Sequence, residues 1–370
     1  MKRGRKKTRK YNLKPACHAP DWWLVGLVLL LSVFGLIIVA NASAVAAFRD
    51  FGNKLHYFRL QFQWLILGLT AFAAACFFPY QKWRKLVPLL LFLTFLSLVL
   101  VVLPKFGFRR FGARRWLNLG GFSFQPAELT KLSFITYLAA YLTKKEQVWP
   151  LLLVSGLILF LVMLQPDLGT TLIILAIGFV VYFVGGMPWW QMLVLGLGAS
   201  LGSFLLIVFS PYRRERWLTF LDPQRDPLGA SYHIRQVLIA LGSGGLFGVG
   251  LGQSRQKYEY LPAVSTDSIF AVVAEELGFA GAAALVLVFA FLIWRGIRVA
   301  QLAPDHFAQL LAVGVTAWVA LQTFINLAAM VALAPLTGTP LPFISYGGSS
   351  LLLILLGMGI LVNISRQTLS

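Results

Sequence analysis

The chain has 370 residues, of which 58% are hydrophobic, 14% aromatic and only 12% charged. Soluble domains carry about 25% charged residues, so this composition excludes a soluble protein and predicts one whose main solvent is lipid. The formal net charge is +19, and eight of the 32 cationic residues lie within the first fourteen positions. Because an apolar stretch follows at once, anionic lipid and cytoplasmic retention explain this basic segment better than nucleic acid does.

Ten apolar stretches are long enough to cross a hydrocarbon core of about 30 Å. In chain order they cover residues 22–40, 59–78, 86–103, 125–142, 150–165, 168–185, 190–210, 269–294, 307–333 and 349–364. The first stretch follows a basic region, as a signal peptide does, but it is too long for one and nine more stretches follow. The sequence therefore predicts an all-α polytopic membrane protein, a bundle of about ten transmembrane helices.

The predicted orientation places both termini in the cytoplasm. On this interpretation residues 1–21 are a basic cytoplasmic tail, residues 22–364 the ten-helix domain, and residues 365–370 a cytoplasmic C-terminus, with a large outer loop at 211–268 between the seventh and eighth helices. A count of Lys and Arg over the whole chain does not decide the orientation, because the inner and outer segments carry similar numbers. The basic tail and the short inner loops decide it, since long loops translocate largely regardless of charge.

The sequence shows no nucleotide, disulfide or zinc site. The glycine-rich stretch at 242–252 has neither the Lys-Ser/Thr ending of a P-loop nor a complete GxGxxG, which favours a flexible or re-entrant loop. Cys17 and Cys76 are both expected on or near the cytoplasmic side, and the four histidines have no paired spacing. A protein-built metal site is therefore not expected, and neither is a Ser-His-Asp triad that sequence alone could identify.

Six ionisable residues fall at membrane depth or at its outer edge, where each costs a few kcal/mol unless it is paired or faces water. They are Glu128, Lys131, Asp167, Asp267, Glu275 and Glu276. Glu128 and Lys131 are three residues apart on one helical face and can neutralise each other. This pair either holds helices together or lines a substrate cavity.

The acidic residues near predicted helix starts have two interpretations. Asp167 and Asp267 could each cap the following helix or contact a ligand. At about 100° per residue, Glu275 projects about 80° from Asp267, whereas Glu276 faces the opposite side. At most one of the two glutamates can therefore share a cavity with Asp267, and Glu275 is the candidate.

Two clusters of arginine lie in the outer loops. They comprise Arg109, Arg110, Arg114 and Arg115 in one loop, and Arg213, Arg214 and Arg216 in the other. Arginine binds phosphate with two parallel hydrogen bonds. Contact with lipid headgroups is the alternative for any single arginine, but two clusters on the side of Asp267 favour an anionic ligand.

Nine short motifs, spread in order along the chain, resemble those of one family. They are GARRWLNLG at 112–120, FQPAE at 124–128, QPDLGT at 165–170, FLDP at 220–223, DPLG at 226–229, YLP at 260–262, TD at 266–267, AEELG at 274–278 and PLPFISYGGS at 340–349. Together they resemble the SEDS family (shape, elongation, division and sporulation), of FtsW and RodA type. The segments at 250–257, 347–351 and 363–366 resemble the FtsW branch more than the RodA branch. Two positions depart from the family: Ser265 stands where His is common, and Ala127 where Ser is common.

The resemblance implies ten helices and a peptidoglycan glycosyltransferase that polymerises lipid II at the outer face of the bacterial inner membrane. It implies a class B penicillin-binding protein as partner, beside other divisome or elongasome membrane proteins, and Asp267 as the catalytic carboxylate. A carboxylate at that position suits a general base, and the outer arginines suit the pyrophosphate leaving group.

Glu128 and Lys131, with Asp167 and Glu275, would contact substrate. Mg²⁺ or Mn²⁺ could bind the pyrophosphate, but no protein ligand set indicates one. A lipid II flippase and a non-catalytic cell-wall scaffold are the alternatives.

Overall fold

The computed structural model describes residues 18–368 except 105, 111–112, 121, 145–147, 166, 210, 223–230 and 259–260. The elements are α1 (Trp22–Phe51), α2 (His56–Phe77), α3 (Tyr80–Val102), β1 (Gly107–Arg110), β2 (Ala113–Leu119), β3 (Phe122–Phe124), α4 (Pro126–Leu142), α5 (Val148–Met163), α6 (Leu168–Val184), α7 (Trp189–Phe209), α8 (Pro211–Leu221), α9 (Tyr232–Ser243), α10 (Ile269–Gln301), α11 (His306–Met330) and α12 (Gly348–Ser365).

The predicted class, an all-α membrane protein, is confirmed. A helix lies at each of the ten predicted ranges. In the part of the chain that the structure describes, six helices are long and apolar enough to cross a membrane: α1, α2, α3, α10, α11 and α12. Shorter apolar helices lie within α5 and α6. The count of ten spans stays a prediction.

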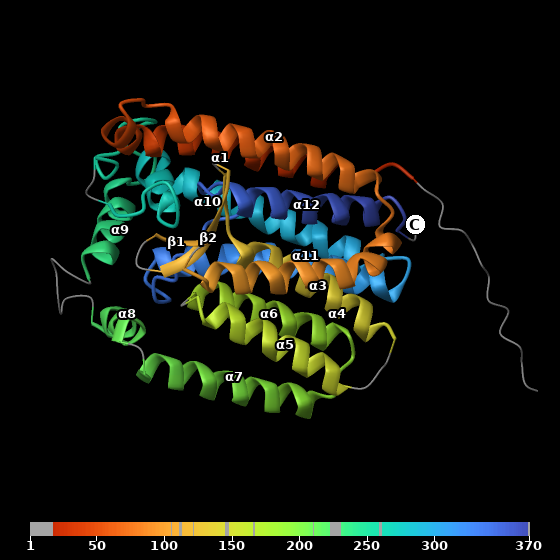
Figure 1. Cartoon of the computed structure of the whole chain (residues 1–370). Coiled ribbons are helices and arrows are strands. Elements are labelled where there is room, and N and C mark those ends of the chain that lie inside the picture. Colours follow the sequence, from red (N-terminus) through yellow and green to blue (C-terminus); the bar gives the residue numbers. More distant parts are fainter. Residues whose placement is uncertain are drawn as a thin grey trace, which may run out of the picture.

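The bundle is built around α11 and α12. Sixteen of the eighteen residues of α12 are buried, which is the pattern of a helix surrounded by others rather than one facing solvent on a side. Helix α12 packs against α2, and α11 packs against α10, α6 and α4. Helix α7 runs along one edge of the bundle and contacts α6 and α8 (Figure 1). The polar side chains of α4 and α11 therefore face the interior of the bundle.

Both described ends of the chain lie at the same end of the bundle. The amide of His18 donates to the carbonyl of Arg366 at 3.0 Å. Asp21 caps α1, and its other carboxylate oxygen accepts from Arg295 of α10 at 2.9 Å. The sheet, α8 and α9 lie toward the opposite end (Figure 1). This arrangement is the one that an even number of spans requires.

The two predicted outer loops contain secondary structure that the sequence did not reveal. The segment at 104–124 forms an antiparallel sheet with the strand order β1-β2-β3. The long loop at 211–268 contains α8 and α9. The longest strand, β2, reads ARRWLNL and lacks the strict alternation of apolar and polar residues that marks a strand in a sequence.

Helix α10 is broken near its start. Gly278 has φ 69° and ψ −171°, a conformation open essentially to glycine alone. A Cβ atom there would lie 2.3 Å from the amide nitrogen of Gly248. The glycine-rich loop at 244–252 therefore packs directly against the break in α10.

Candidate functional site

A cavity of about 210 Å³ opens at the end of the bundle opposite the termini. Four parts of the chain between α7 and α12 form its wall: α8, α9, Asp267 just before α10, and the segment that follows α11. The lining residues are Glu215, Arg216, Thr219, Phe220, His233, Ile234, Asp267, Ala334, Pro335 and Leu336. The cavity thus combines one arginine, one histidine and two carboxylates with an apolar wall.

Asp267 lies immediately before α10 but does not cap it. The N-cap is Ser268, and its side chain makes no capping hydrogen bond. One carboxylate oxygen of Asp267 accepts a hydrogen bond from the hydroxyl of Thr266 at 2.6 Å. The side chain of Asn326 donates to the main-chain carbonyl of Asp267 at 2.8 Å. The capping interpretation of Asp267 is therefore wrong, and the carboxylate faces the cavity.

His233 enters the cavity from α9, and no motif or spacing in the sequence points to it. Its Nε2 lies 2.6 Å from the hydroxyl of Ser268, next to Asp267. Burial lowers the pKa of His233, with Arg216 adding to this effect and the carboxylate of Asp267 opposing it. The neutral imidazole is therefore favoured, a form that both donates and accepts hydrogen bonds. Only tertiary contact could have identified this residue.

The predicted arginines of α8 occupy different environments. Arg216 lines the cavity, and its Nη1 donates to the carbonyl of Leu336 at 2.6 Å. Arg214 is exposed and is not among the lining residues. The side chain of Arg213 lies outside the described residues, as do those of Arg109 and Arg110. The structure thus brings one predicted cation, Arg216, together with Asp267.

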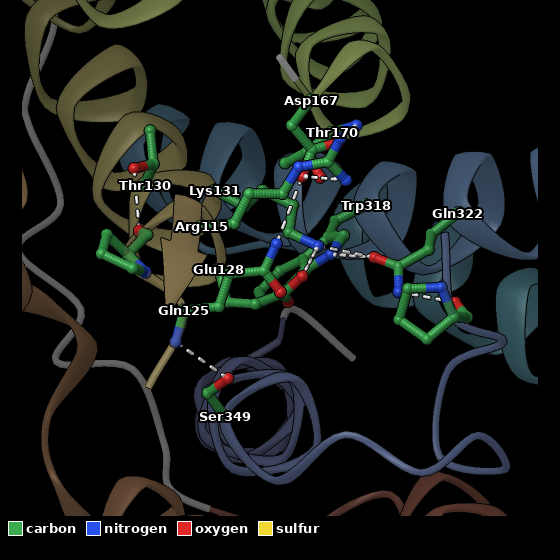
Figure 2. Close-up of polar contacts among 12 residues, drawn as sticks. Arg115, Gln125, Glu128, Thr130, Lys131, Asp167, Thr170, Trp318, Gln322 and Ser349 are labelled. Atoms are coloured by element: carbon green, nitrogen blue, oxygen red, sulfur yellow. Dashed lines mark hydrogen bonds and ion pairs between the residues drawn. The ribbon is translucent and has the colours of Figure 1, made fainter. Parts of the chain in front are cut away.

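A buried polar network lies between α4 and α11 (Figure 2). The ammonium of Lys131 lies 2.8 Å from a carboxylate oxygen of Glu128 and 2.7 Å from the amide oxygen of Gln322. It also lies 4.9 Å from the centre of the Trp318 ring, within the range of a cation–π contact. Both ionic side chains are at most 2% exposed. The predicted neutralisation of Glu128 by Lys131 is confirmed.

A second group joins β2 to the start of α6 (Figure 2). Asp167 caps α6 by accepting from the amide of Thr170 at 3.1 Å, so its predicted capping role is confirmed. Its other carboxylate oxygen accepts from Gln125 at 3.2 Å and lies 3.7 Å from Arg115. Neighbouring strand residues point to opposite faces, so Arg114 does not share this position. Asp167 therefore acts both as a cap and as the anionic partner of Arg115.

Helix α11 connects the buried network to Asp267. Gln322, which binds Lys131, donates to the carbonyl of Pro340 at 2.9 Å. Asn326, one turn further along the same face, donates to the carbonyls of Thr339 and Asp267. The segment before α10 and the segment before α12 are thus held against one face of α11.

Glu275 is not brought to the cavity. Its carboxylate accepts from the hydroxyl of Ser254 and from the amide of Arg255. Glu276 accepts from Asn41 and from the amide of Ser254, and it lies 3.7 Å from the ammonium of Lys257. Both glutamates bind the segment that follows the glycine-rich loop. The helical projection placed the two glutamates on opposite sides and made Glu275 the candidate for the cavity, whereas both bind the segment at 254–257 and neither lines the cavity.

Comparison with known families gives one match over nearly the whole chain. The model of the FtsW/RodA/SpoVE family, described as a cell cycle protein, matches residues 21–370. The stage V sporulation protein E of Bacillus subtilis (strain 168) is 42% identical over 95% of this chain and 98% of its own length. A probable peptidoglycan glycosyltransferase FtsW of Thioalkalivibrio sulfidiphilus is 40% identical, with 94% and 90% coverage.

Solved structures agree with these relatives. A chain from a study of how a peptidoglycan synthase complex coordinates polymerization and crosslinking has a TM-score of 0.77 and 32% identity, covering 94% of this chain and 98% of that one. The rod shape determining protein RodA of Thermus thermophilus has a TM-score of 0.70 and 31% identity, with 95% and 98% coverage. The similarity therefore extends over nearly the whole length of these chains.

Proposed function

The chain belongs to the FtsW/RodA/SpoVE family of cell cycle proteins, and we propose that it is a peptidoglycan glycosyltransferase of the bacterial inner membrane that polymerises lipid II. One observation carries the proposal. The carboxylate of Asp267 and the guanidinium of Arg216 line the same cavity at the end of the bundle. A base and a cation that share one cavity suit a transfer from a lipid pyrophosphate.

The proposed reaction is a single displacement. The carboxylate of Asp267 takes the proton from the 4-hydroxyl of the acceptor N-acetylglucosamine. That oxygen then bonds to C1 of the donor N-acetylmuramic acid while the bond from C1 to the pyrophosphate oxygen breaks. The leaving lipid pyrophosphate carries the negative charge away, and Arg216 stabilises it. The α-linked donor gives a β-linked product.

His233 supports the reacting segment. A neutral imidazole beside the hydroxyl of Ser268 fixes the chain next to Asp267 and adds no charge that would pair with the base. Lys131 with Glu128 supports the segment before α12 through Gln322, which donates to the carbonyl of Pro340. One oxygen of Glu128 accepts no hydrogen bond within the described part of the chain. A polar group of the substrate could bind to that oxygen.

We expect the loss of Arg216 to affect substrate use more than the loss of Arg214. Both arginines belong to α8, but only Arg216 lines the cavity. A hydrogen bond to a charged group contributes about 1.5–3 kcal/mol, so Arg216→Ala should lower kcat/KM for lipid II about 10- to 100-fold. Arg214→Ala should change it little. Equal losses in the two variants at matched protein levels would indicate general attraction to lipid headgroups instead.

The orientation belongs to the same proposal: the cavity faces outward, residues 1–21 and 365–370 are cytoplasmic, and residues 22–364 span the membrane. The basic tail and the common end of the two termini support it. A cysteine at Asp222 should react with an impermeant thiol reagent added to intact cells, and a cysteine at Arg298 should not. Equal labelling at both positions would contradict the proposed topology.

The proposed partner is a class B penicillin-binding protein. The support is the similarity to a chain from a synthase complex in which polymerization and crosslinking are coordinated. Purified protein in liposomes, given lipid II with and without such a partner, tests the function. Glycan strands should form, and more of them with the partner present. Movement of lipid II across the bilayer without any glycan would instead indicate a transporter.

A further inference from the structure

The glycine-rich loop at 244–252 contains no charged residue and exposes most of its large apolar side chains. Leu246 is 67% exposed, Phe247 85% and Leu251 63%. The neighbouring end of α9 adds Leu238 and Ile239, which are also exposed. Exposure of such an apolar patch to water is unfavourable, so its position relative to the membrane decides whether lipid or a protein partner covers it.

The backbone of this loop makes hydrogen bonds with the main-chain groups on either side of the break in α10. The amide of Val249 donates to the carbonyl of Glu275 at 3.0 Å, and the amide of Phe279 donates to the carbonyl of Gly245 at 2.8 Å. The amide of Gly250 likewise donates to the carbonyl of Glu276, and the amide of Ala280 donates to the carbonyl of Leu246. Irregular backbone at membrane depth is tolerated only where its polar groups are satisfied in this way. The loop therefore meets the requirement for lying within a bilayer.

The length of α10 places the loop at the outer edge of the hydrocarbon core. Arg295 marks the inner boundary, because it pairs with Asp21 at the start of α1 and lies beside Trp294. Gly278 is seventeen residues away, about 26 Å at 1.5 Å per residue. A hydrocarbon core is about 30 Å thick. The break, and with it the loop, therefore lies just inside the outer boundary.

Charged residues around the loop are arranged as this depth requires. Glu275 and Glu276 are at most 2% exposed and have hydrogen-bond donors from the segment that follows the loop. The ammonium of Lys257 is also buried, 3.7 Å from Glu276. By contrast, Arg235 and Arg255 are exposed on either side of the loop, where they suit lipid phosphates.

We propose that the loop at 244–252 inserts into the outer leaflet and that phospholipid acyl chains cover Leu246, Phe247 and Leu251. The exposed side of α10 continues this surface, since Phe279 and Leu287 are both 68% exposed. The loop is hydrogen-bonded to α10 at the break around Gly278, on the membrane side of Asp267. If Asp267 is the base of the proposed reaction, the insertion also fixes its height above the lipid pyrophosphate.

Spin labels in lipid vesicles test the insertion without any measurement of activity. In a background with Cys17→Ser and Cys76→Ala, single cysteines replace Phe247 or Leu251, are labelled with a nitroxide and are reconstituted without partner. Collision rates are then measured for oxygen, which concentrates in lipid, and for a water-soluble nickel complex.

Leu287→Cys is the lipid reference, because position 287 is exposed midway along α10, and Asp222→Cys is the aqueous reference. Labels at 247 and 251 should collide more often with oxygen than with nickel, as at 287, and the order should reverse at 222. Nickel accessibility at 247 and 251 equal to that at 222 would overturn the proposal and leave the surface for a protein partner. Because each variant is read in the folded, reconstituted state, this outcome is independent of whether lipid II is polymerised.

Discussion

Asp267→Asn should fold and insert normally but polymerise lipid II about 10²–10⁴ times more slowly than the native protein, which is the usual cost of losing a general base. The side-chain amide of Asn has the shape of the carboxylate, and its oxygen can still accept the hydrogen bond from Thr266. Because Ser268 and not Asp267 is the N-cap, the start of α10 does not depend on the carboxylate. The substitution therefore removes the base and leaves the surrounding contacts in place.

The measurement is glycan product formed from lipid II, with thermal stability recorded for the same preparations. Asp50→Asn is the matched control, because Asp50 is at the same end of the bundle in an exposed ion pair with Arg49. Near-native polymerisation by Asp267→Asn would exclude Asp267 as the base. A parallel fall in stability would show that the carboxylate has a structural role beyond its hydrogen bond from Thr266.

Lys131→Met should destabilise the protein by about 3–5 kcal/mol, the cost of removing one partner of a buried ion pair. The carboxylate of Glu128 would remain buried without its cation, and the amide oxygen of Gln322 would lose a donor. Met is close to Lys in length and shape, so the packing against Trp318 changes little. The expected loss therefore reports charge rather than volume.

A double-mutant cycle separates the pair from its surroundings. Glu128→Gln combined with Lys131→Met leaves no buried charge in the pair, so the double variant should be more stable than Lys131→Met alone. A thermal shift assay in detergent compares the stability of all four proteins. If the two single losses simply add in the double variant, the residues do not act as a pair. Activity of the double variant then shows whether the charges also serve substrate binding.

The sequence by itself determined the features that depend on local patterns. Ten apolar runs of sufficient length predicted helices at the correct places, because the cost of placing polar backbone in lipid leaves few alternatives to a helix. The Glu128–Lys131 pair was predictable from a spacing of three on one helix. Asp167 was predictable as a cap because capping involves only the next few residues. These rules act within one continuous stretch of neighbouring residues, and the sequence displays them directly.

Tertiary structure alone decided the composition of the cavity. The sequence placed Asp267, Arg216 and Glu275 in one group, but the fold keeps the first two together and turns Glu275 toward Ser254. It also adds His233, thirty-five residues before Ser268 along the chain. Contacts over such separations depend on how α8, α9 and the break in α10 pack, and no spacing rule extends that far. The packing of distant segments, not the local pattern, therefore determines which side chains share the site.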